Sequence, residues 1–245
     1  MNPPRTPLFD FPDVVLHCEE LTVKTHPHFT AAKAGDIVAA DALVAELTNP
    51  TYITTLRAEL AKGAVELVAV HALETAGVNE IPAALAKLIA RPLALPVYES
   101  IVQANSVGHT GAGGYHRLAH QAQFTGAVTA GRSYFLVDDF VGQGGTLANL
   151  IGFIRSNGGR VLGATVLTGK PYSAKLAPDL ASIQALRNRY GQEFEEWWRQ
   201  RLGFGFDCLT RSEARYLENS ADADTIRNRL TAAGLESGSD RNRAG

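Results

Sequence analysis

Cysteine is nearly absent from this 245-residue chain, which contains only Cys18 and Cys208. Two cysteines so far apart provide neither a disulfide framework nor a cysteine zinc cluster, so we expect free thiols in a reducing compartment. Long apolar runs are also missing, because no stretch of the sequence is long enough to span a bilayer. Prolines and Asp10 stand where a signal peptide needs an apolar core. We therefore expect a cytoplasmic protein with no membrane partner.

An excess of basic charge is missing as well. Lys and Arg total 23 against 25 Asp and Glu, which gives a formal net charge of −2. Non-specific binding to nucleic acid depends on excess positive charge, so we expect no nucleic-acid partner. The composition that remains is 45% hydrophobic and 20% charged. That is typical of a globular protein and is enough for one α/β domain with a helical appendage.

Strand-like and helix-like segments alternate through the middle of the chain. Short apolar runs predict strands that are buried on both faces, and apolar side chains at helical spacing predict helices between them. The predicted strands cover residues 65–72, 93–97, 134–137 and 161–167, and the predicted helices residues 81–89 and 147–154. This alternation predicts an α/β fold with an open, mostly parallel sheet flanked by helices.

The two flanking regions differ from this core. At the N-terminal side, residues 14–23 are short and apolar like a strand, and residues 36–47 have an imperfect helical stripe. From Pro171 on, the chain is helical and more charged, and the adjacent Trp197 and Trp198 are expected to pack this region. We divide the chain into an N-terminal hood (1–64), a core (65–170) and a C-terminal helical region (171–245) with a disordered tail from Ser237.

The most informative stretch lies at the end of the third predicted core strand. Two carboxylates, Asp138 and Asp139, follow the apolar run, and a glycine-rich turn then opens a helix. The turn consists of Gly142, Gln143, Gly144, Gly145 and Thr146. An acidic pair alone is usually a surface turn or a helix cap, and glycine turns alone are common. The joint pattern is much rarer and favours a binding site.

This pattern suits a sugar phosphate on physical grounds. Ligands of open α/β sheets bind at the carboxyl edge, where this strand delivers its carboxylates. Backbone N–H groups of the turn and of the helix start form a phosphate cradle, and glycine lets the backbone approach the phosphate closely. Sugar hydroxyls can donate hydrogen bonds to Asp138 and Asp139.

The stretch resembles the motif for 5-phosphoribosyl-1-pyrophosphate (PRPP) in type I phosphoribosyltransferases, and is most similar to their adenine and ComF-like branches. The resemblance covers about residues 65–170. It implies that Asp138 and Asp139 face the ribose hydroxyls and that the turn from Gly142 to Thr146 holds the 5-phosphate. It also implies Mg²⁺ held through PRPP and waters with no direct protein ligand, a nitrogenous small-molecule acceptor, and a homodimer.

Three further segments are similar to parts of that family, each with an alternative. The resemblance makes Glu74, Thr75, Ala76 and Gly77 the pyrophosphate loop, although an ordinary strand-to-helix connection fits too. Residues 105–117 stand where the family has a flexible catalytic loop, to which His109, His116 and Arg117 would supply cations, unless they are ordinary solvated residues. Lys170 stands at the acceptor position of purine relatives, or it is a capping or exposed lysine.

Two departures from the family pattern leave the function open. Gly142 replaces an aspartate that assists at the acceptor in some members, and no basic residue is evident among Glu74 to Gly77. The first hypothesis is a Mg-dependent phosphoribosyltransferase that releases pyrophosphate. The second is a non-catalytic PRPP-sensing regulatory module. A third, handling of nucleic acid, follows from the ComF-like resemblance alone and has no electrostatic support.

Overall fold

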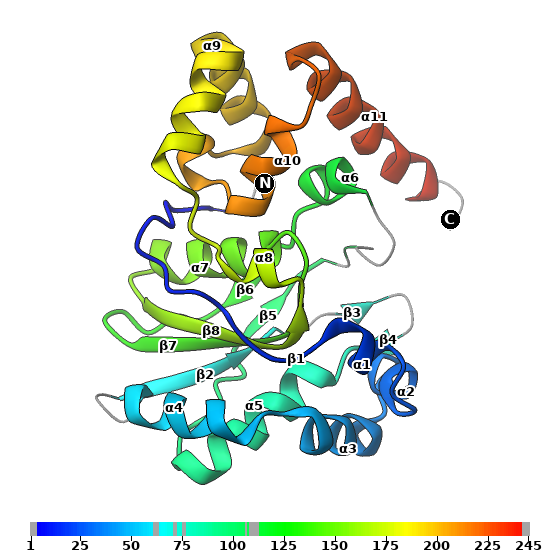
Figure 1. Cartoon of the computed structure of the whole chain (residues 1–245), viewed down its shortest axis with the longest axis vertical. Helices are drawn as coiled ribbons and strands as arrows, with labels where there is room; N and C mark the ends of the chain where they lie inside the picture. The colour runs from blue at the N-terminus through cyan, green and yellow to red at the C-terminus, as the bar shows by residue number, and fades with distance from the viewer. Residues whose placement is uncertain are drawn as a thin grey trace.

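The computed structural model describes residues 4–60, 64–70, 73–74, 77–105, 107 and 113–241. A four-stranded parallel sheet forms its centre, with helices on both faces (Figure 1). The predicted α/β class with an open parallel sheet is therefore confirmed. The strands lie in the order β1 (Val15–Cys18), β8 (Arg160–Gly169), β7 (Ser133–Val141) and β2 (Val65–Ala69).

The order of the strands creates a switch point at β2. A parallel bridge joins Leu67 of β2 to Val97, which is the next residue along the chain that pairs with this sheet. β7 comes later in the chain and pairs with the other side of β2. Ligands of open α/β sheets bind outside the carboxyl ends of the strands at such a point. A ligand site is therefore expected at the carboxyl ends of β2 and β7.

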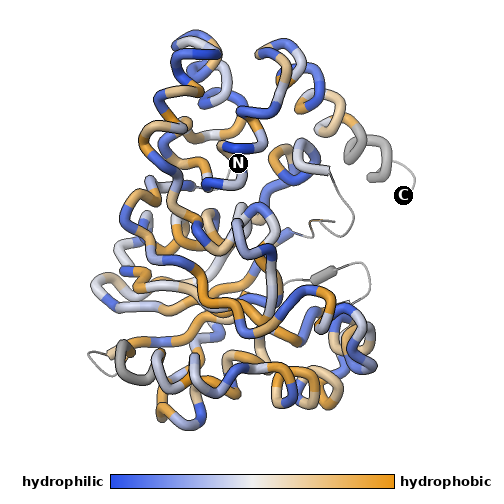
Figure 2. Tube along the Cα trace, viewed as in Figure 1, coloured by the Kyte–Doolittle hydropathy of each residue, from blue (hydrophilic) through white to orange (hydrophobic). Residues whose placement is uncertain are grey.

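Alternating side chains on the strands bury both faces of the sheet. Leu67 of β2 packs with the helices of one face and Val68 with the helix of the other. On the first face lie α3 (Ile37–Leu47), α4 (Pro50–Leu60) and α5 (Ile81–Leu93). On the second face lies α7 (Gly145–Ser156). Figure 2 shows hydrophobic residues concentrated along the central strands.

The N-terminal hood is part of the sheet because it contributes β1, which pairs with β8. The apolar segment predicted as a strand over 14–23 divides in two, since β1 ends at Cys18 and the short helix α1 (Glu20–Lys24) follows. A second short helix, α2 (Phe29–Lys33), leads to α3. Asp36 caps α3 by accepting a hydrogen bond from the Ala39 backbone N–H at 3.0 Å.

Two strand predictions need correction. The strand predicted over 93–97 is absent as such, because α5 continues to Leu93 and ends at Ala94 in the left-handed conformation. Only Val97 pairs with the sheet there. β7 is longer than predicted and runs through Asp138 and Asp139 to Val141, since β8 pairs with it over its whole length.

The C-terminal region forms a third hydrophobic cluster. Its elements are α8 (Pro171–Ala174), α9 (Leu180–Leu202), the 3₁₀ turn η1 (Phe206–Cys208), α10 (Arg211–Glu218) and α11 (Ala223–Arg241). Trp198 is fully buried in this cluster and Trp197 packs against it, as predicted. α11 includes Ser237 and continues to Arg241, where the sequence predicted disorder. Residues 242–245 lie outside the described residues.

A hairpin and a helix lie between the core strands. β5 (Ile101–Gln103) pairs antiparallel with β6 (Phe124–Gly126). Between them is α6 (Gly114–Ala119), which was not predicted and packs against α11. Both cysteines are free thiols, as expected. Among the described residues, no helix is long and apolar enough to cross a membrane.

Candidate functional site

The predicted acidic pair lies at the carboxyl edge of the sheet. β2 pairs with β7 only as far as Val137, whereas β8 accompanies β7 to Val141. Asp138 and Asp139 therefore extend past the end of β2, on its open side. The two carboxyl groups lie near each other, because the side chain of Asp139 acts on Asp138 both through its charge and through a hydrogen bond. Asp139 meets the hood, where Lys33 Nζ of α2 donates to its Oδ2 at 2.9 Å.

Asp138 is the more buried of the two acids, with 5% of its surface exposed. Its Oδ1 accepts a hydrogen bond from the Asp139 backbone N–H at 2.8 Å. Burial raises the pKa of Asp138 well above its ordinary value, and the adjacent Asp139 charge raises it further. The Asp139 N–H and the Lys33 charge act in the opposite direction.

The turn after β7 has the geometry of an anion cradle. Gly144 caps α7 with φ of 81°, a left-handed conformation that favours glycine. A Cβ at Gly144 would also lie 2.4 Å from Leu176 Cδ2. The first backbone bond of α7 runs from Ala148 N–H to the Gly144 carbonyl, so the N–H groups before it have no partner within the helix. Such N–H groups at a helix start attract phosphate.

Arg117 lies against this turn. A Cβ built on Gly142 would be only 2.6 Å from Arg117 Nη1, which means that the guanidinium occupies the space of a side chain there. Arg117 belongs to α6, so it is held by a helix and not by the flexible loop predicted for residues 105–117. His116, on the same helix, stacks on His120 with ring centroids 4.1 Å apart. His109 lies outside the described residues.

The described residues of the predicted pyrophosphate loop belong to a hairpin. Glu74 and Gly77 pair across a hairpin of β3 (Leu73–Glu74) and β4 (Gly77–Val78), and α5 begins only at Ile81. Thr75 and Ala76 lie outside the described residues. The described residues of this segment therefore form a hairpin ahead of α5, and their role as a pyrophosphate loop stays a prediction.

The hood brings to this edge two lysines that sequence reasoning missed. A Cβ on Gly77 would lie 2.4 Å from the Ala34 carbonyl oxygen, so the end of α2 packs on the hairpin. Lys33, the residue before Ala34, extends from there to Asp139. Lys24 Nζ lies 5.4 Å from the centre of the Phe140 ring. No local pattern signals these lysines, because each acts on a residue more than a hundred positions away.

Lys170 lies beside the turn without contacting the acidic pair. It follows β8, is exposed, and occupies the N-cap position of α8. Its backbone N–H donates to the Val141 carbonyl at 3.2 Å, and its Nζ lies 6.0 Å from the Tyr172 ring. The alternative proposed from the sequence, a capping or exposed lysine, is therefore observed, although the Lys170 side chain makes no cap hydrogen bond; the acceptor role stays a prediction.

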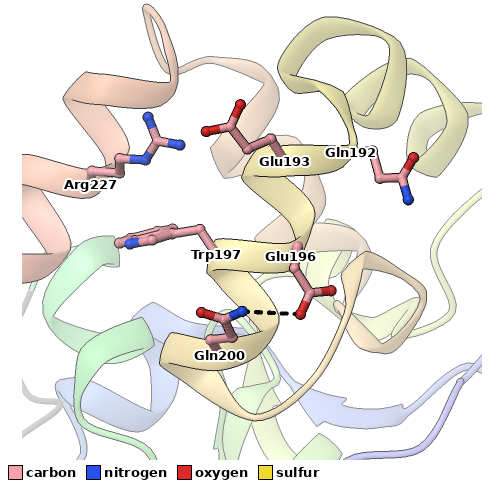
Figure 3. Close-up of a pocket in the computed structure, with 6 residues that line it drawn as sticks. All are labelled: Gln192, Glu193, Glu196, Trp197, Gln200 and Arg227. Carbon is pink, nitrogen blue, oxygen red and sulfur yellow. Dashed lines mark hydrogen bonds between the residues drawn. The ribbon is translucent and has the colours of Figure 1, made fainter.

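A separate pocket of about 660 Å³ lies between α9 and α11 (Figure 3). Arg227 stands over the ring of Trp197 there, 5.6 Å from its centre. The lining residues are Gln192, Glu193, Glu196, Trp197, Gln200 and Arg227. None of them belongs to the predicted site, so the pocket is a feature of the C-terminal region alone.

Comparisons with known proteins place the chain among sequences that are longer than it. No family model matches it. It is 38% identical over 229 residues to "Protein TraN" from Escherichia coli, which covers 94% of this chain and 51% of that protein. It is 37% identical over 145 residues to an uncharacterized protein from Haemophilus influenzae, covering 59% of this chain and 32% of that protein. The chain thus spans about half or less of the length of these relatives.

Among solved structures, a crystal structure of adenine phosphoribosyltransferase is similar at a TM-score of 0.36. The identity is 13%, and the match covers 62% of this chain and 76% of that one.

Proposed function

We propose that this chain is a phosphoribosyltransferase, which transfers phosphoribose from PRPP to a nitrogenous acceptor and releases pyrophosphate. One observation carries the proposal: the junction of β7 and α7. There, two carboxylates extend past the end of β2 at a topological switch point, and a glycine turn under a guanidinium follows them. Carboxylates beside a phosphate cradle match the hydroxyls and the 5-phosphate of one ribose.

Each group has a role that follows from its position. The turn amides and Arg117 bind the 5-phosphate, for which a guanidinium is well suited because its N–H groups match phosphate oxygens. Asp138 and Asp139 bind the ribose hydroxyls and so orient the anomeric carbon for in-line attack by the acceptor. Lys33 adds positive charge next to Asp139, on the side where the hood covers the edge. Holding both reactants in line lowers the barrier chiefly through orientation.

Mg²⁺ would bind at this site through PRPP and waters. Among the described residues, no group of three His, Cys, Asp or Glu side chains could hold a metal. Mg²⁺ keeps several waters and binds through substrate phosphates with one or two carboxylates at most, which suits an ion carried by PRPP beside the acidic pair. When bound, the ion would neutralise the charge of the departing pyrophosphate.

A pyrophosphate-release screen tests the proposal. Purified protein with PRPP and Mg²⁺ is offered a panel of purines, pyrimidines and other nitrogen heterocycles, and pyrophosphate is measured. We expect release with at least one acceptor class, lost in Asp139→Asn and retained in Glu193→Gln, whose carboxyl lies in the separate α9–α11 pocket. Release that is the same in Asp139→Asn and in the wild type would rule out this site.

A second candidate, a module that binds PRPP without transferring it, is favoured by the β3–β4 hairpin. This hairpin stands where the pyrophosphate loop was predicted and precedes the start of α5 at Ile81, so the helix-start amides of α5 are not part of that loop. The module keeps the turn and the acidic pair, so both candidates predict PRPP binding. Saturable PRPP binding without pyrophosphate release for any acceptor would favour the module.

A further inference from the structure

The C-terminal region donates a hydrogen bond to the phosphate-binding turn. The Thr210 hydroxyl donates to the Gln143 carbonyl oxygen at 2.6 Å, although the two residues are 67 positions apart. Thr210 is completely buried, and its Cγ2 would lie 3.4 Å from a Cβ on Gly144. The peptide unit between Gln143 and Gly144 is therefore fixed from one side by Thr210.

Fixing that carbonyl fixes a phosphate-binding amide. In a trans peptide the C=O and the following N–H point in opposite directions. With the Gln143 carbonyl turned to Thr210, the Gly144 N–H has to point away from the C-terminal region. Gly144 is the N-cap of α7, so this N–H belongs to the set of amides at the helix start. A rotation of this peptide would turn the N–H out of the cradle and a carbonyl oxygen into it, which would repel a phosphate.

The hydroxyl of Thr210 is committed to this bond by the groups around it. Thr210 and Glu213 form a capping box at the start of α10: the hydroxyl accepts from Glu213 N–H at 3.1 Å, and Glu213 Oε2 accepts from Thr210 N–H at 2.9 Å. A hydroxyl has one proton, and because its oxygen accepts from Glu213, that proton goes to Gln143.

A buried ion pair holds the capping box against α7. Arg5 donates to both carboxylate oxygens of Glu213, at 2.6 and 3.0 Å, and its Nε donates to Asn149 Oδ1 of α7 at 2.6 Å. Side-chain exposure is 1% for Arg5 and 3% for Glu213. The N-terminal segment, α10 and the helix that opens from the turn are thus joined in one network, whose last member is the Thr210 hydroxyl.

We propose that Thr210 is a positioning residue, which orients the Gln143–Gly144 peptide so that the turn can bind a phosphate monoester. This inference rests on the proposed phosphate-binding role of the turn. It gives the C-terminal region a function in the site.

The test compares Thr210→Val, which has the same shape without the hydroxyl, with Thr210→Ser, which restores the hydroxyl. Asp222→Ala serves as the matched control, since Asp222 accepts from Thr225 N–H at the start of α11 and so provides a cap in the same region, away from the turn. Two quantities are measured in each protein: hydrogen exchange of the amides from Gly144 to Thr146, and affinity for PRPP with Mg²⁺ and for inorganic phosphate.

We expect Thr210→Val to speed exchange at these amides and weaken both affinities about tenfold, in line with the loss of one hydrogen bond. Thr210→Ser and Asp222→Ala should stay near the wild type both in amide exchange and in the affinities for PRPP and phosphate. Unchanged exchange in Thr210→Val, or the same increase in Asp222→Ala, would overturn the inference. If the wild type bound neither PRPP nor phosphate, the proposed function would be wrong. The hydrogen-exchange comparison would still decide whether Thr210 orders the turn, because it needs no ligand.

Discussion

At Gly142, the absence of a side chain makes room for a charged group. Arg117 Nη1 fills the space in which a Cβ would stand. In the sequence, Gly142 departs from the pattern of the phosphoribosyltransferases it resembles, because some of them have an aspartate at this position. The structure gives the departure a physical meaning: a cation approaches the turn where a side chain would block it.

Gly142→Ala should therefore weaken phosphate binding without unfolding the protein. The new methyl would displace the end of a flexible arginine, which costs little stability but moves the guanidinium off the turn. We expect PRPP affinity to fall about tenfold and the melting temperature to change by no more than a few degrees. Calorimetric titration and thermal unfolding measure the two. Gly113→Ala is the control, since nothing lies within 4 Å of a Cβ there; the same affinity in both variants would contradict the placement of Arg117.

Through Asp138, the stability of the folded protein depends on pH in the opposite sense to that of most acidic side chains. Its pKa is raised in the folded state by burial and by Asp139, so the folded state binds its proton more tightly than the unfolded state does. Stability from this group is present at acidic pH and is lost as the pH rises through the interval above its ordinary pKa. Asp138→Asn removes the charge and keeps an acceptor for the Asp139 N–H.

We therefore expect Asp138→Asn to be more stable than the wild type at pH 8, with a difference that narrows toward pH 4. Urea unfolding across that range measures it. A difference that grows as the pH falls would show that Asp138 is stabilised as a carboxylate.

At the scale of elements, β1 is held against its neighbours by a buried histidine. His17 is 6% exposed, its Nε2 lies 3.0 Å from Thr165 Oγ1 on β8, and its ring meets Tyr52 of α4 edge-on. Burial lowers the pKa of His17 from 6.5 to about 4. The unfolded chain then binds a proton that the folded one does not, so β1 loses stability as the pH falls from 6.5 to 4.

Replacing His17 by Gln should flatten this part of the stability profile, since the amide can keep the bond to Thr165 but does not titrate. The pKa shift of His17 corresponds to a loss of about 3 kcal/mol at most in the free energy of unfolding. Denaturant unfolding at pH 7 and pH 4.5 measures the loss in both proteins. An equally large loss in His17→Gln would assign the acid sensitivity to other groups.

Elements with a strong local pattern were predictable, and those that depend on distant partners were not. α5 and α7 follow from apolar side chains at helical spacing, and β8 from an apolar run. α6 buries only Tyr115 and Leu118, and its partner α11 lies about a hundred residues further on, so no local period marks it. The two carboxylates interrupted the apolar pattern of β7 and concealed that it continues to Val141.

On the scale of the whole molecule, the edge is built from all three predicted regions. The core supplies the acidic pair, the turn and Arg117; the hood supplies Lys33, and the C-terminal region supplies Thr210. The sequence predicted the carboxylates and the glycines because they are neighbours in the chain. It could not predict Lys33 or Thr210, since their contacts with the site join residues 106 and 67 positions apart and leave no local pattern.

Calorimetric titration with PRPP and Mg²⁺ measures whether Asp138, Asp139 and the following turn bind PRPP. The wild type is compared with the double variant Asp138→Asn, Asp139→Asn. Hydrogen bonds to charged groups contribute about 1.5–3 kcal/mol each, and each 1.4 kcal/mol is about a factor of ten. We predict saturable binding by the wild type and at least a hundredfold loss in a double variant that still unfolds cooperatively. No binding by the wild type, or equal binding by both proteins, would contradict the account.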